Sequence, residues 1–155
     1  MSKQRVAEQV TDAVATYDSD FFEWTQQTAE LIRQGRLTEA DLEHVAEEIA
    51  DMGKRDRREV RSRLRVLLVH LLKWQLQPLQ RTSSWKATIL EQRAQLALVL
   101  DDSPSLRRIP ANELEVVYRS AVDRAIAETK LAPDVFPADC PFTIAEIVDH
   151  DFFPN

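Results

Sequence analysis

One stretch decides the fold of this chain: residues 54–77 read KRDRREVRSRLRVLLVHLLKWQLQ, and Pro78 follows. At 100° per residue, a helix over this stretch gathers most of its large apolar side chains in an arc of about 140°. They are Val60, Leu64, Leu67, Leu68, Leu71 and Leu72. Val66 and Val69 lie on the opposite side, so the helix is apolar almost all round between residues 64 and 72. The pattern predicts a long central helix over about 54–77 that Pro78 ends.

The sequence on either side predicts further helices. Two glycines in 155 residues leave few tight hairpin turns, which argues against a sheet. We expect an all-α fold: a compact bundle of five to seven helices in one domain over residues 1–155, with a lead-in, residues 1–16, that is frayed or helical. Besides the central helix, the expected helices run from Asp18 or Asp20 to Gln34, from Thr38 to about Met52, from Ser83 or Ser84 to about Asp101, from Asn112 to Lys130 and from Thr143 to about His150.

Local signals mark several of the expected helix ends. Gly35 is a C-cap candidate, and Thr38 with Asp41 resembles a capping box, as does Thr143 with Glu146. Gly53 either ends the helix that precedes it or only bends it into the central helix. The helix before Gly53 has an expected inner stripe of Leu42, Val45, Ala46 and Ile49.

Composition excludes several classes of protein. One cysteine rules out a disulfide scaffold and a multi-cysteine metal site. No apolar run approaches the roughly 20 residues that span a bilayer, and residues 1–10 contain no secretory signal, so we expect a cytoplasmic protein. The net charge of −6 is unevenly placed: residues 1–53 carry −8, residues 54–100 carry +8 and residues 101–155 carry −6. A basic centre between acidic arms can be neutralised by folding or by a partner.

Several motifs together resemble a bacterial family that is abundant in cyanobacteria. They are EEIADMG at 47–53, RLRVLLVHLLKWQ at 63–75, QP at 77–78, SW at 84–85, DSPSL at 102–106, ET at 128–129 and FPADCP at 136–141. The family is catalogued as domain of unknown function twenty-nine, and the resemblance covers nearly the whole chain. It implies a small helical protein and implies no activity. The chain departs from the expected pattern at Gln27-Thr28 and at Ile109-Pro110-Ala111.

A basic stripe of Lys54, Arg58, Arg61 and Arg65 follows one face of the central helix. Residues 54–65 hold seven basic and two acidic side chains, and such a high density of positive charge could bind phosphate groups. However, the preceding helix is acidic, and a fold-back at Gly53 would set Glu48 against Arg58. We therefore expect the protein's own acids, or those of a second subunit, to match this stripe.

A polar cluster is expected around the turn that follows the central helix. Its members are Arg63, His70, Trp74, Gln77, Arg81, Trp85, Gln92 and Arg93. A helical hairpin that turns near Arg81 would place His70 opposite Gln92, so we expect a buried, structural His70 hydrogen-bonded to Gln92. The alternative makes His70, Trp74, Gln92 and Arg93 the floor of a ligand pocket. Arg81, between two tryptophans, is expected to pack on them through cation–π contacts.

The sequence offers no set of residues typical of an enzyme or a metal centre. His44, Glu47 and Glu48 are separated from His70 by too much helix to share an ion. There is no phosphate-binding glycine loop and no nucleophile motif, and Cys140 lies among acidic neighbours that would raise the pKa of its thiol. We expect no metal and no cofactor, and we lean against an enzyme.

The function we expect is a small protein–protein interaction module that associates with itself or with another protein. Two alternatives stay open. One is a nucleic-acid binder that uses the basic stripe, and the other is an enzyme or small-ligand binder around His70, Trp74, Gln92 and Arg93. No membrane association is expected.

Overall fold

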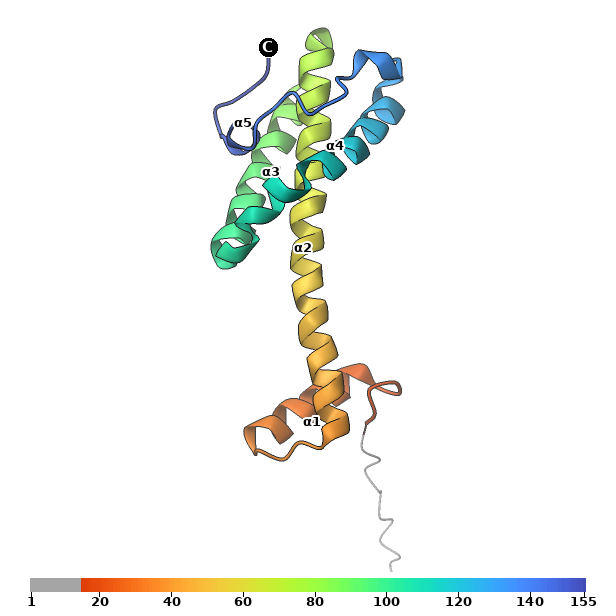
Figure 1. Cartoon of the computed structure of the whole chain (residues 1–155), viewed down its shortest axis with the longest axis vertical. Helices are drawn as coiled ribbons and strands as arrows, with labels where there is room; N and C mark the ends of the chain where they lie inside the picture. Colours follow the sequence, from red (N-terminus) through yellow and green to blue (C-terminus); the bar gives the residue numbers. More distant parts are fainter. Residues whose placement is uncertain (1–14) are drawn as a thin grey trace, which may run out of the picture. The chain divides into compact units, whose positions relative to one another are not determined.

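The computed structural model describes residues 15–155, so most of the expected lead-in lies outside the described residues. The described elements are all helical, which confirms the all-α expectation. The α-helices are α1 (Phe21–Arg33), α2 (Glu39–Leu76), α3 (Ser83–Asp102), α4 (Arg108–Thr129) and α5 (Ile144–Val148); three short 3₁₀ helices are η1 (Pro78–Gln80), η2 (Pro104–Arg107) and η3 (Pro133–Val135) (Figure 1). The chain divides into two compact units, residues 1–51 and residues 52–155. We call their described parts the N-terminal and C-terminal units.

Helix α1 begins and ends where the sequence predicts. Asp20 is its N-cap, and the Asp20 side chain accepts a hydrogen bond of 3.0 Å from the backbone N–H of Glu23. Gly35 follows the helix with a φ of +66°, a left-handed conformation that glycine adopts without strain. Trp24 and Thr28 are the buried residues of α1 and form the inside of the N-terminal unit.

Helix α2 continues through Gly53, so the two helices expected around this residue are one helix of 38 residues. A glycine inside a helix costs only about 1 kcal/mol relative to alanine, too little to break an otherwise regular hydrogen-bond ladder. The start of α2 is fixed by Thr38 and Asp41, which exchange backbone-to-side-chain hydrogen bonds of 3.4 and 3.3 Å as predicted. The predicted inner stripe is wrong: Val45 is half-buried, but Leu42, Ala46 and Ile49 are exposed.

The core of the C-terminal unit forms around the second half of α2, as the sequence predicts. Leu64, Leu67, Leu68, Val69, Leu71 and Leu72 are all at most 1% exposed. They are covered by side chains from α3, α4, α5 and the segment before α5, chiefly Ile89, Val117, Tyr118, Ala121, Ala125, Phe136, Phe142 and Ile147. Because residues 64–72 are apolar on nearly every side, burying their large apolar side chains requires cover from several elements at once. Of the helices described, none has the length and hydropathy that a membrane span requires.

The remaining helices differ from expectation only at their ends. Helix α3 is capped by Thr82, one residue before the predicted candidates. Helix α4 begins at Arg108 rather than Asn112, because Pro110 is buried in its first turn, where a missing N–H costs nothing. The predicted capping box of Thr143 and Glu146 is present at the start of α5.

Replacing Leu68 tests the central role of α2. We expect Leu68→Ala to lower the free energy of unfolding by about 2–5 kcal/mol, since it opens a cavity in a filled core. The matched control is Leu98→Ala on α3, where the same side chain is 57% exposed and the loss should stay below about 0.5 kcal/mol. Urea unfolding followed by circular dichroism measures both. Equal losses in the two variants would contradict this assignment of the core.

Candidate functional site

Arg93 holds residues 146–154, which we call the C-terminal segment. Its side chain is only 4% exposed, and it donates to four backbone carbonyl oxygens. Nε donates to Ile147 at 2.8 Å, Nη2 to Phe152 at 2.8 Å and to Glu146 at 3.4 Å, and Nη1 to His150 at 3.3 Å. Burial lowers the pKa of Arg93, whereas Asp149 and Asp151 raise it. A guanidinium remains charged at neutral pH, so Arg93 supplies fixed donors for the last turn of α5 and the tail.

Arg81 and Trp74 hold the same segment from a second side. Arg81 donates from Nε to the Trp74 carbonyl at 2.8 Å and from Nη2 to the Pro154 carbonyl at 3.2 Å. Its guanidinium lies 5.1 Å from the Trp74 ring, which confirms one of the two expected cation–π contacts. The other is wrong, because the cation over Trp85 is Lys73, at 4.6 Å. Phe153 packs against Trp74 with 5.0 Å between ring centroids.

His70 is half-buried rather than buried, and the predicted hydrogen bond to Gln92 is wrong. Its Nδ1 lies 2.9 Å from the carbonyl oxygen of Val66, one turn earlier in α2. Gln92 instead accepts a hydrogen bond of 3.5 Å from Arg63. The packing of α3 on α2 therefore differs in register from a hairpin centred on Arg81. Burial is the main cause that lowers the pKa of His70.

The polar cluster is therefore divided: Trp74, Arg81 and Arg93 meet at residues 152–154, and the other members do not join them there. Arg63 pairs with Gln92 and with Glu59, and His70 bonds within its own helix. Gln77 precedes η1, where its N–H donates to the Lys73 carbonyl. The donors of Arg81 and Arg93 are occupied by the chain's own carbonyls, so they anchor the C-terminal segment and leave few hydrogen bonds for a ligand.

The basic stripe divides into paired and unpaired arginines. Arg57, beside the stripe, donates from Nε to Glu113 Oε1 at 2.7 Å, and Arg61 lies with Nε 2.8 Å from Glu113 Oε2. Glu113 belongs to α4, so the expected match by the protein's own acids is present for these two arginines, but with a different acid. Within residues 15–155, Arg58 and Arg65 have no ion-pair partner.

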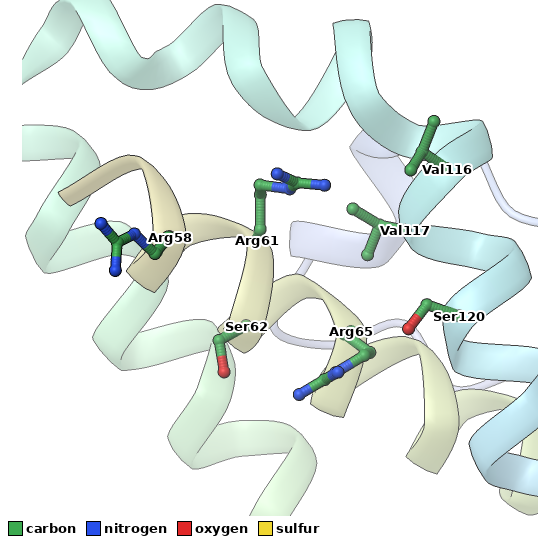
Figure 2. Close-up of a pocket in the computed structure, with 7 residues that line it drawn as sticks. All are labelled: Arg58, Arg61, Ser62, Arg65, Val116, Val117 and Ser120. Atoms are coloured by element: carbon green, nitrogen blue, oxygen red, sulfur yellow. The ribbon is translucent and has the colours of Figure 1, made fainter. Parts of the chain in front are cut away.

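A groove of about 220 Å³ lies between α2 and α4 in the C-terminal unit, where Val117 and Ser120 point toward α2 (Figure 2). Arg58, Arg61 and Arg65 of the basic stripe line it, together with Ser62, Val116, Val117 and Ser120. The Nε of Arg65 is buried and has no hydrogen-bond acceptor. The fourth member of the predicted stripe, Lys54, does not line the groove.

Sequence reasoning missed the α4 side of this groove. Residues 113, 117 and 120 are spaced i, i+4, i+7 and share one face of α4, a pattern that is visible in the sequence. Nothing local in the sequence connects that face with residues 58–65, however, because the pairing depends on how α4 packs across α2.

An aromatic cluster fixes the N-terminal unit. The rings of Tyr17 and His44 stack with centroids 4.3 Å apart, and Trp24 meets both edge-on. The Tyr17 hydroxyl donates to Glu48 at 2.6 Å, and this hydrogen bond to a carboxylate raises the pKa of Tyr17 to about 12. His44 and Glu48 are thereby used in packing and hydrogen bonding within this unit.

The described residues provide no evident metal or nucleophile site. Nowhere in residues 15–155 do three histidine, cysteine or acidic side chains gather as a metal ion would require. Cys140 is half-buried, and burial, assisted by Glu146, raises the pKa of its thiol. The direction is the predicted one, although burial is the larger cause. A thiol with a raised pKa is a poor nucleophile at neutral pH.

Removing the Arg93 guanidinium tests the anchor. We expect Arg93→Met to lower the free energy of unfolding by about 3 kcal/mol, because four buried or partly buried hydrogen bonds to backbone carbonyls lose their charged donor. Hydrogen exchange of residues 147–155 should accelerate in the same variant. Arg119→Met, at an exposed arginine of α4, is the control and should change stability by less than about 0.5 kcal/mol. Unaltered exchange at residues 147–155 would contradict the anchor role.

His70 should make stability depend on pH. The unfolded histidine has a pKa near 6.5, and the folded pKa is lower, so the unfolded chain binds the proton first as pH falls. Stability should then decrease as pH falls from above 6.5 and level off below the folded pKa. His70→Gln should remove this decrease between about pH 7.5 and 5.5, above the carboxylate range. Urea unfolding at each pH measures it, and an identical slope in the variant would refute it.

Comparison with known proteins identifies the family. The family model described as "Domain of unknown function DUF29" matches residues 16–153. The chain is also similar to an α-helical protein of unknown function from Rhodospirillum rubrum that has been solved by crystallography. The two sequences are 30% identical. That match has a TM-score of 0.58 and covers 89% of this chain and 92% of the other. No curated protein matches the chain. The expected resemblance is confirmed, and the chain belongs to the DUF29 family.

Proposed function

We propose that this protein is an interaction module whose N-terminal unit binds a basic amphipathic helix of another protein. The observation that carries the proposal is the exposed apolar face of α2 within that unit. Leu42, Ala46 and Ile49 are spaced i, i+4, i+7, the spacing of a helix-packing seam. Leu42 is 50% and Ile49 64% exposed. We call these three residues the α2 seam.

The charge beside the α2 seam favours a basic partner. Glu39, Glu43 and Glu47 follow one another at four-residue intervals along the adjacent face of α2, and all three are exposed. Within the described residues, none of them forms an ion pair. An amphipathic helix that lays an apolar face on the seam would bring its flanking side chains beside these carboxylates. Lysine or arginine at those flanks gives complementary charge, which speeds association and selects partners.

The chain's own basic helix is less suitable as that partner, because its apolar side chains, including Val60 and Leu64, are already buried in the core. Arg57 and Arg61 are held by Glu113, and Arg63 is held by Glu59. Pairing with a second copy through these residues would have to replace ion pairs that the folded chain already forms. A basic helix of another protein carries no such cost, and it is the partner that we propose.

A designed peptide pair tests the proposal. One amphipathic helical peptide carries a leucine face with lysine edges, and its twin carries the same face with glutamate edges. We expect the lysine peptide to bind at least about tenfold more tightly, as measured by fluorescence anisotropy, because only its edges complement the carboxylates. Ile49→Ser should weaken that binding about tenfold while leaving the unfolding free energy within about 0.5 kcal/mol.

Leu98→Ser is the matched control, since Leu98 is similarly exposed on α3, and it should leave peptide binding unchanged. Equal binding of the two peptides would overturn the proposal, as would equal weakening by Leu98→Ser. A dimer seen by analytical ultracentrifugation that dissociates in Ile49→Ser would show instead that a second copy covers the seam, and would also overturn it.

A further inference from the structure

The groove between α2 and α4 presents donors without acceptors. Arg58 and Arg65 have no anionic partner within the part of the chain that the structure describes. The Nε of Arg65 is shielded from solvent and makes no hydrogen bond. A buried N–H that has lost water and gained no acceptor costs roughly 1–3 kcal/mol. An acceptor that enters the groove would remove this cost.

The charge of the groove is strongly positive. Arg57, Arg58, Arg61 and Arg65 lie at or beside it, and Glu113 is the one carboxylate paired with any of them in the described structure. Glu113 neutralises at most one of the four arginines. Ser62 and Ser120 add hydroxyl groups that can donate to an anion from α2 and from α4.

The other wall of the groove is apolar. Val116 and Val117 of α4 line it, and Val116 is 59% exposed. The volume, about 220 Å³, lies below the roughly 300–1,000 Å³ of sites for drug-sized ligands. Such a site fits one compact anionic group attached to a small apolar body.

We propose that this groove binds the phosphate group of a small organic phosphomonoester, with the arginines and serines on the phosphate and the valines against its organic part. Arginine forks match phosphate oxygens in pairs, and a tetrahedral dianion has enough acceptor sites for donors that arrive from two helices. The proposal does not depend on the proposed function, which concerns the N-terminal unit. A nucleic-acid strand fits less well, because it needs a continuous basic track and Glu113 holds Arg57 and Arg61.

Phenyl phosphate and inorganic phosphate are the probes, and calorimetric titration of the whole protein is the measurement. We expect phenyl phosphate to bind at least about fivefold more tightly than inorganic phosphate and to raise the melting temperature. Arg65→Gln should weaken phenyl phosphate binding at least about tenfold. The control Arg119→Gln removes the same charge from α4 outside the groove and should change binding less than about twofold.

Glu113→Gln should change the affinity for phenyl phosphate in the opposite direction from Arg65→Gln. It frees Arg57 and Arg61 from their competing carboxylate, so phenyl phosphate binding should tighten by about threefold or more, a result that misfolding would not produce. Absence of saturable binding by the wild-type protein would overturn the proposal, as would equal weakening by Arg119→Gln. If a deoxythymidine oligonucleotide binds more tightly than phenyl phosphate, with a steep salt dependence, the groove is part of a nucleic-acid surface and the proposal is wrong.

Discussion

Between residues 64 and 72, helix α2 carries large apolar side chains almost all round, and only Arg65 and His70 interrupt them. The C-terminal unit follows from this constraint, since α3 and α4 alone provide only part of the cover and the segment from η3 to the C-terminus provides the rest. That segment is mostly irregular, and its backbone carbonyls need donors where they become buried. Arg93 and Arg81 supply these donors, which explains why two arginines lie at the edge of an apolar core.

The parts of the fold that the sequence predicted correctly are those fixed by neighbours along the chain. Asp20, the pair of Thr38 and Asp41, and the pair of Thr143 and Glu146 cap their helices because each needs only residues three positions away. The burial of the leucines between residues 64 and 72 was equally predictable, since a helix that is apolar almost all round must pack those side chains away from water.

The parts that failed depend on packing between elements. The interruption considered at Gly53 is absent because one glycine costs less than the loss of a helical turn. The expected bond between His70 and Gln92 required a particular register of α3 on α2, and Gln92 meets Arg63 instead. The same limit applies to the groove: arginines 58, 61 and 65 were visible as a stripe, whereas Val116, Val117 and Ser120 join them only through the packing of α4.

The helix spacing of the arginines explains how one basic segment can serve both the fold and a site. Arg57 and Arg61 are four residues apart, so both reach the single carboxylate of Glu113 on α4. Arg58 and Arg65 are seven residues apart on the neighbouring line of the helix, and neither has a carboxylate partner in the described structure. Repulsion among neighbouring arginines opposes folding, and the free energy of core burial can offset this repulsion although the like charges remain. One more acid on α4 facing Arg65 would have ended the repulsion, as Glu113 does one turn before Val117. Because the described residues place Ser120 there instead, the groove keeps its positive charge for an anion that the chain itself does not supply.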